Sequence, residues 1–70
     1  MKDVYAVFVY IPYLKGYDWS LISRDLASCE TRYNEKLGNV LLIKTKKVYF
    51  KPVMSLDEIK KDFIILKEKI

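Results

Sequence analysis

The residues best suited to chemistry lie in a basic segment past the middle of the chain. The segment contains four lysines and two aromatic residues: Lys44, Lys46, Lys47 and Lys51 with Tyr49 and Phe50. Lysine ammonium groups bind phosphates, and an exposed aromatic ring can stack on a base. Exposed strands also carry lysines to avoid edge-to-edge pairing, and the segment lacks arginine, the usual residue for base and phosphate recognition. The alternative hypothesis for function is therefore a nucleic-acid-binding protein that uses Lys44, Lys46, Lys47, Tyr49 and Lys51.

A second group of candidate residues is aromatic. Tyr10, Tyr13, Tyr17 and Trp19 lie close together beside Pro12 and Gly16, two residues that predict a loop. Tyrosine and tryptophan combine a large apolar area with a polar group, and they are enriched at the energetic centres of protein interfaces. Trp19 fits a core position at the start of a helix, whereas Tyr13 and Tyr17 are better candidates for contact with a partner.

Catalytic and metal-binding patterns are scarce. The chain has no histidine, so the commonest general base and the commonest zinc ligand are both missing, and Cys29 is the only cysteine. Asp57 and Glu58 fit helix capping better than acid–base catalysis. A nuclease without histidine, built from Arg24, Arg32 and tyrosines, is the enzymatic alternative. We expect a non-enzymatic protein without a cofactor or a metal.

Length and charge limit the class of protein further. Seventy residues, about half of them hydrophobic, predict a single α+β domain over residues 1–70. The formal net charge of +4 is uneven, because residues 36–56 contain five lysines and no acidic residue. The sequence has no apolar run of membrane-spanning length and no signal-peptide pattern, so we expect a cytoplasmic protein.

The elements that must position these residues begin with Val4–Ile11. This run contains four β-branched and three aromatic residues without alternation, which predicts a strand covered on both faces. Helical spacing of apolar residues predicts a helix over residues 19–37, with Asp18 or Ser20 as its cap and Gly38 after its end. Its apolar stripe would consist of Trp19, Ile22, Leu26, Cys29, Tyr33 and Leu37.

The second half of the chain predicts one more β segment and one more helix. Residues 40–51 have strand composition at both ends and a polar centre, which favours a hairpin turning at residues 45–47. The turn lacks Gly, Asn and Asp, so one long bent strand is the alternative. Ser55 and Glu58 match a capping box, which predicts a helix with an apolar stripe from Leu56 to Ile70.

Together these elements predict a small β-α-β-β-α domain: a three-stranded mixed sheet with two helices packed on one face. One face of Val4–Ile11 would then stay uncovered, unless the loop of residues 12–18 folds over it. The uncovered face would be either Val4, Ala6, Phe8 and Tyr10 or Tyr5, Val7, Val9 and Ile11. An exposed apolar patch of this kind marks an interface.

The leading hypothesis is a small protein-interaction module. It would act as a regulator or inhibitor by binding a larger protein, or it would form a homodimer. The predicted contact residues are the aromatic anchors Tyr10, Tyr13 and Tyr17 and the basic residues Lys44, Lys46 and Lys47. The lysines would complement an acidic partner surface and speed the encounter with it.

Overall fold

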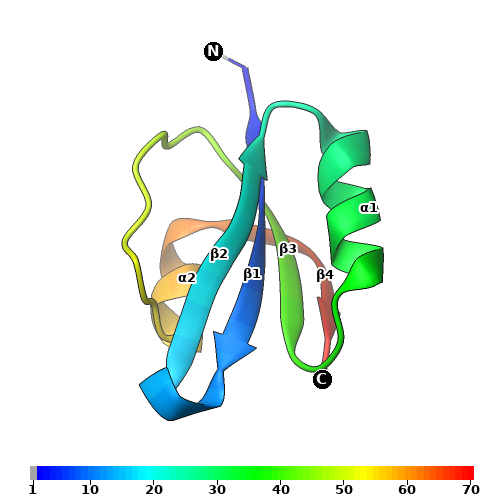
Figure 1. Ribbon diagram of the computed structural model, residues 1–70. Helices are drawn as coiled ribbons and strands as arrows, with labels where there is room; N and C mark the ends of the chain where they lie inside the picture. The colour runs from blue at the N-terminus through cyan, green and yellow to red at the C-terminus, as the bar shows by residue number, and fades with distance from the viewer. Residues whose placement is uncertain (1) are drawn as a thin grey trace.

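The computed structural model describes residues 2–70, which form four strands and two helices (Figure 1). In chain order the elements are β1 (Val4–Ile11), a 3-10 turn (Pro12–Leu14), β2 (Gly16–Ser23), α1 (Leu26–Glu35), β3 (Val40–Thr45), α2 (Leu56–Asp62) and β4 (Ile64–Lys69). The α+β class and the first strand agree with the sequence-based prediction. Neither helix in the described part of the chain is long and apolar enough to cross a membrane.

The four strands form one antiparallel sheet in the order β2-β1-β3-β4. The prediction of a three-stranded mixed sheet is wrong: β2 and β4 lie in segments expected to be largely helical, and the second arm of the expected hairpin, residues 48–51, is not a strand. β2 turns back on β1 as a hairpin, which reverses the chain before α1 begins. As a result β3 returns antiparallel to β1 on its other side, without a parallel crossover.

The false helical signal at the start of β2 has a structural cause. The pairing of β1 with β2 shifts between Val7 and Phe8, where Ser20 is the extra residue of a bulge. The bulge interrupts the two-residue alternation of the strand. Trp19 and Ile22 therefore face the same side of the sheet at a spacing of three residues, the spacing that also suits one face of a helix.

The helix α1 begins after Asp25. The carboxylate of Asp25 accepts a hydrogen bond from the amide of Ala27, so this residue caps the helix and the prediction of Asp18 or Ser20 as the cap is wrong. Beyond the end of the helix, Gly38 has the positive φ that the sequence predicts, 83°.

Residues 46–55, here named the crossing loop, form neither a hairpin nor a continuation of β3. The side chain of Phe50 enters the core. Further along, Met54 exchanges two backbone hydrogen bonds of 2.7 and 2.9 Å with Tyr17, which join the loop to the outer edge of β2. The chain therefore leaves β3, reaches the far edge of the sheet and returns through α2.

The last predicted helix is divided between α2 and β4. The capping box is present, because the Ser55 hydroxyl accepts from the Glu58 amide and the Glu58 carboxylate accepts from the Ser55 amide. The helix ends at Asp62, and the β-branched residues Ile64 and Ile65 begin a strand along the open edge of β3. The prediction of one helix extending to the end of the chain is therefore wrong.

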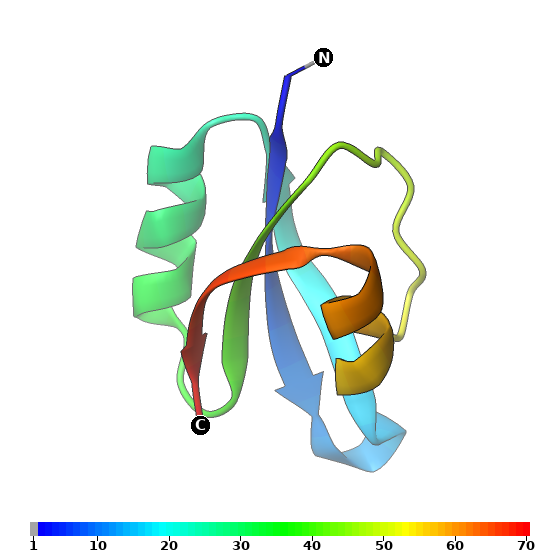
Figure 2. The same cartoon turned by 180° about the vertical axis from the view of Figure 1, so that it is seen from behind.

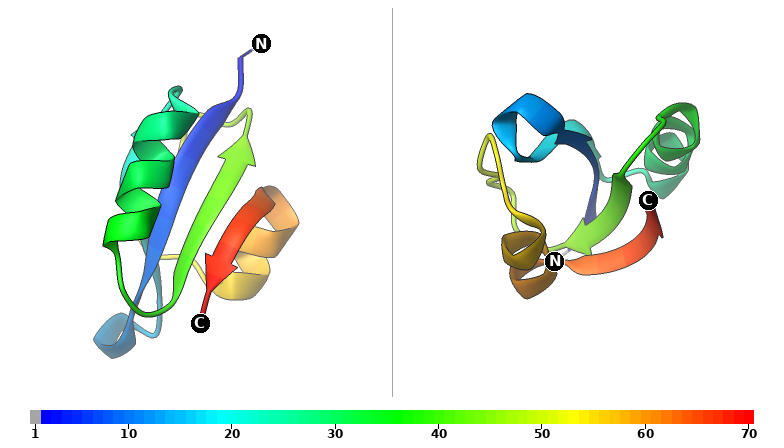
Figure 3. Two further views of the ribbon diagram at one scale, coloured as in Figure 1. Left: turned by 90° about the vertical axis from the view of Figure 1, so that its right-hand side faces the viewer. Right: turned by 90° about the horizontal axis from the view of Figure 1, so that it is seen from below.

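The two helices lie on opposite faces of the sheet, so the prediction that both pack on one face is also wrong (Figures 2 and 3). On the face that α1 covers, Cys29 and Tyr33 of the helix pack with Val7, Val40 and Leu42 of the sheet. The other face, under α2 and the crossing loop, buries a larger cluster that includes Phe8, Phe50, Met54, Ile59 and Phe63. β1 thus packs against the chain on both faces, and the uncovered apolar face predicted for it does not exist.

Polar contacts tie α1 to both edges of the sheet. Arg32 donates hydrogen bonds to the carbonyl and the hydroxyl of Ser20, at 3.0 and 2.9 Å, and so fixes the bulge of β2. At the opposite edge, Lys67 of β4 forms an ion pair of 3.4 Å with Glu30. Arg32 and Glu30 therefore help to dock the helix on the sheet.

Replacement of Leu42 by Ala tests whether α1 covers a packed face. Leu42 is fully buried, so Leu42→Ala should lower the free energy of unfolding by about 2–5 kcal/mol, measured by urea denaturation. The control Leu37→Ala makes the same truncation at an exposed position and should change it by less than about 0.5 kcal/mol. Small effects of both variants would contradict the packing of α1 on the sheet.

Candidate functional site

The aromatic loop predicted after β1 is a tight turn at one end of the sheet. Its 3-10 turn, Pro12–Leu14, is closed by a hydrogen bond of 3.1 Å from the Lys15 amide to the Pro12 carbonyl. Lys15 takes the left-handed conformation, with φ of 53°. Tyr13 projects from this turn with 85% of its surface exposed.

The two other tyrosines of the predicted contact set pack against each other. The rings of Tyr10 and Tyr17 meet edge to face, with centroids 5.3 Å apart. Tyr17 is only 7% exposed, and burial, together with the charges of Glu68 and Tyr10, raises the pKa of its hydroxyl. Tyr17 therefore belongs to the core, Tyr10 is half-buried, and Tyr13 is the tyrosine of this set that is free to reach a partner.

Gly16 permits the crossing loop to approach this end of β2. A Cβ atom at Gly16 would lie 2.6 Å from Cγ1 of Val53 and 3.2 Å from the carbonyl oxygen of Met54. The missing side chain leaves the space in which Met54 pairs with Tyr17. The absence of a side chain at Gly16 thus allows the backbone of the crossing loop to pack against β2.

A second exposed apolar side chain lies at the same end of the sheet. Leu37 is 88% exposed, although the sequence places it on the buried stripe of a helix. It precedes β3 in a connection whose Asn39 carbonyl accepts a hydrogen bond of 3.0 Å from the Tyr10 amide. We name Tyr13, Leu14 and Leu37 the apolar end; the 3-10 turn and the connection from α1 to β3, which carry them, lie at the bottom of Figure 1.

The predicted basic contacts lie at the opposite end. Lys46 and Lys47 follow the end of β3 that pairs with Val4, at the start of β1, whereas Tyr13 follows the end of β1. Lys44 is half-buried within β3 itself. The six residues predicted to contact a protein partner therefore do not form one surface.

The residues of the nucleic-acid hypothesis do come together. A cleft of about 460 Å³ lies between the crossing loop and the C-terminal end of α2. Lys46, Lys47, Tyr49 and Lys51 line it on the loop side, and Met54 and Phe63 contribute apolar lining. Lys44 lines a neighbouring hollow that also contains Lys46. The sequence analysis missed Met54 and Phe63 because their approach depends on the crossing of the loop and on the break between α2 and β4.

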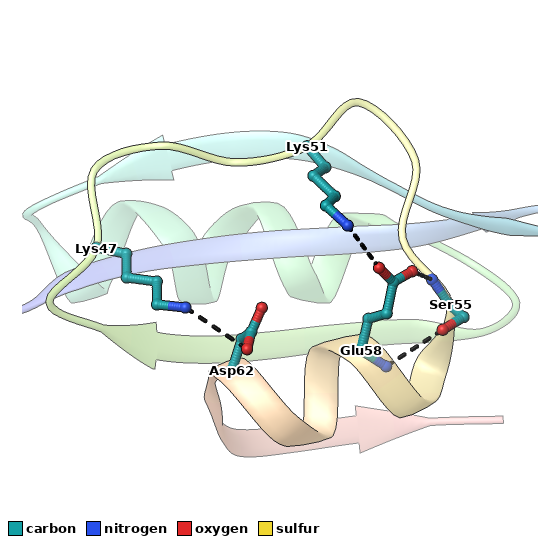
Figure 4. Close-up of polar contacts among 5 residues, drawn as sticks. All are labelled: Lys47, Lys51, Ser55, Glu58 and Asp62. Carbon is teal, nitrogen blue, oxygen red and sulfur yellow. Dashed lines mark hydrogen bonds and ion pairs between the residues drawn. The ribbon is translucent and has the colours of Figure 1, made fainter.

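Ion pairs join the crossing loop to α2 (Figure 4). Lys51 donates to the Glu58 carboxylate at 2.8 Å, and Lys47 lies 3.5 Å from the Asp62 carboxylate. The hydrogen bond from Lys51, followed by that from the Ser55 amide, lowers the pKa of Glu58 to about 2. The Glu58 partner in turn raises the pKa of Lys51.

Several residues considered for catalysis or metal binding have other surroundings in the described part of the chain. Within residues 2–70, no group of three or more His, Cys, Asp and Glu side chains is placed to hold a metal ion. Cys29 is buried, and burial raises the pKa of its thiol, which disfavours the reactive thiolate. Arg32, a candidate in the nuclease alternative, is engaged with Ser20.

The variant Glu58→Gln tests the contact between the loop and α2. Because the folded-state pKa of about 2 lies below the ordinary value of 4.5, the carboxylate stabilises the fold above about pH 4.5, and this contribution is lost as the pH falls towards 2. We expect Glu58→Gln to have a lower Tm than wild type near neutral pH and the difference to shrink on acidification, in thermal denaturation followed by circular dichroism. A difference that stays constant with pH would contradict the pairing. The control Glu35→Gln, which removes only a long, exposed ion pair of 3.8 Å with Arg32, should change the Tm less.

No known family model matches this chain, and neither a curated protein nor a solved structure matches it. Its function therefore has to be inferred from the two surfaces described above, the apolar end and the cleft beside α2.

Proposed function

We propose that the protein is a small non-enzymatic interaction module that binds a larger protein through the apolar end. The observation that supports this proposal is the exposure of Tyr13 and Leu37, at 85% and 88%, on two separate turns at one end of the sheet. Exposed apolar side chains gathered at one end of a sheet are candidates for an interaction site. A tyrosine among them supplies a large contact area with a polar hydroxyl, as interface hot spots do.

The backbone of both turns is fixed by hydrogen bonds within the chain. Pro12 fixes the backbone at the start of the 3-10 turn, and the hydrogen bond from Lys15 closes it. The Tyr10–Asn39 hydrogen bond ties the other connection to β1. Because the backbone is already ordered, little conformational entropy is lost on binding.

The charges beside the apolar end favour an acidic partner surface. Lys15 follows the exposed turn, and Lys36 precedes Leu37. Basic groups at the rim of an apolar contact speed association with an acidic surface and add to its specificity. By occupying such a surface, the module would act as a regulator or inhibitor of its partner.

Paired substitutions at the two ends of the sheet test this proposal. The double variant Tyr13→Ser/Leu37→Ser should retain its fold but capture at least about tenfold less of the protein that the wild type captures by cross-linking from cell lysate. The matched double variant Val48→Ser/Tyr49→Ser removes exposed apolar groups from the opposite end and should capture as much as wild type. Loss of capture with the second variant alone would contradict the proposal.

Light scattering separates a different partner from a second copy of the chain. A wild-type dimer that dissociates in Tyr13→Ser/Leu37→Ser would identify the partner as the chain itself. A wild-type chain that is monomeric and still captures a protein from the lysate would identify the partner as a different protein.

A further inference from the structure

We propose that the cleft between the crossing loop and α2 is a second binding site, for an anionic ligand with a planar ring. The chemistry is that of a nucleotide, in which a phosphate lies beside an aromatic base. The lysines at its mouth, Lys46 and Lys47, follow the end of β3 that lies opposite to the apolar end, so the proposal does not rest on the protein-binding function.

The cleft has an excess of positive charge. Its lining contains three lysines and one aspartate, and with the Glu58 carboxylate that pairs with Lys51 the formal excess is one positive charge. Lys46 forms no ion pair with another described residue. The Lys47–Asp62 pair is long, at 3.5 Å, and the side chains are 56% and 42% exposed, so it is a weak pair that a phosphate can replace. Lys46 and Lys47 are therefore the assigned phosphate ligands.

Lys51 has a different role in this site. Its ammonium group is held at 2.8 Å by Glu58, which is itself fixed by the capping box of α2. A group bound this closely is less available to a ligand. Lys51 instead fastens the far wall of the cleft to α2 and thereby positions the loop.

The apolar part of the cleft suits a planar ring. Met54 and Phe63 are almost fully buried in its lining, whereas Val48 and Tyr49 are 74% and 76% exposed at its rim. The Phe63 ring already stacks on Phe50, with centroids 5.2 Å apart. Tyr49 has no aromatic partner among the described residues, so its face is open to a base, as in proteins that bind single strands by stacking.

The crossing loop is anchored on both sides of Tyr49, which limits the conformational entropy that it loses when a ligand binds. The Lys47 amide donates a hydrogen bond of 3.0 Å to the Thr45 hydroxyl before the exposed pair, and Phe50 is buried directly after it. The cleft volume of about 460 Å³ lies within the range of small-ligand sites, about 300–1,000 Å³. The site is thus large enough for a mononucleotide or for one unstacked nucleotide of a strand.

Titration of the isotopically labelled full chain, followed by NMR amide shifts at low salt, tests the proposal. AMP and UMP should shift the signals of residues 46–51 and 62–63, and inorganic phosphate or adenosine alone should bind at least about tenfold more weakly. Tyr49→Ala should weaken nucleotide binding about tenfold and leave phosphate binding unchanged. Lys46→Gln should weaken both, whereas Lys15→Gln and Tyr13→Ala, at the apolar end, should change neither.

A short oligothymidylate distinguishes the two sources of this chemistry. Tighter binding than UMP, with the same dependence on Tyr49 and Lys46, would identify a nucleic-acid strand as the ligand. Equal binding would identify a free nucleotide. The proposal is overturned if none of these probes shifts the amide signals of the cleft residues at millimolar concentration. It is also overturned if phosphate binds as tightly as the nucleotides, or if Tyr49→Ala leaves nucleotide binding unchanged.

Discussion

β1 is apolar on both faces, so this small chain has to supply two separate covers for one strand. Ala6 and Phe8 face one side and Val7 faces the other, and all three side chains are fully buried. The hydrophobic free energy of the fold depends on both covers, because a single helix can shield only one face of a sheet. α1 covers the face of Val7. The chain must then reach the other face, and it does so through the crossing loop and α2.

The two surfaces proposed for binding follow from this arrangement. With both faces of the sheet covered, the exposed apolar side chains lie mainly on the turns, on the crossing loop and on β4. At one end, short turns carry Tyr13 and Leu37. The crossing loop, which starts at the other end, borders a cleft beside α2 and is joined to this helix by lysine–carboxylate pairs. The apolar end offers contact area, whereas the cleft offers positive charge beside an aromatic ring, so the two surfaces suit different ligands.

Patterns that depend on neighbours in the sequence predict the structure well. The composition of Val4–Ile11 marks β1 with its correct bounds, and Ser55 with Glu58 marks the start of α2. Cys29 is buried as its spacing predicts. In each case the decisive interactions lie within the element or within a few residues of it, so local sequence carries the information.

Sequence patterns predict the wrong element where the structure depends on pairing between segments that are distant in the sequence. Trp19 and Ile22 have helical spacing only because a bulge opposite Val7 and Phe8 shifts the strand, and β4 forms only because β3 presents an open edge. The candidate residues divide in the same way. The exposure of Tyr13 and the grouping of Lys46 with Tyr49 follow from nearby sequence. The exposure of Leu37 and the contribution of Phe63 to the cleft depend on where α1 and α2 end.

The most direct test of the central claim is a nuclear Overhauser spectrum of the monomeric protein. If both covers come from the same chain, Val7 will show cross-peaks to Cys29 and Tyr33 of α1, and the ring of Phe8 will show cross-peaks to Phe50 and Phe63, whose centroids both lie 5.9 Å away. Isotope-filtered spectra should show all these contacts to be intramolecular. The absence of either set, or its origin in a second copy, would contradict the account and restore an uncovered face on β1.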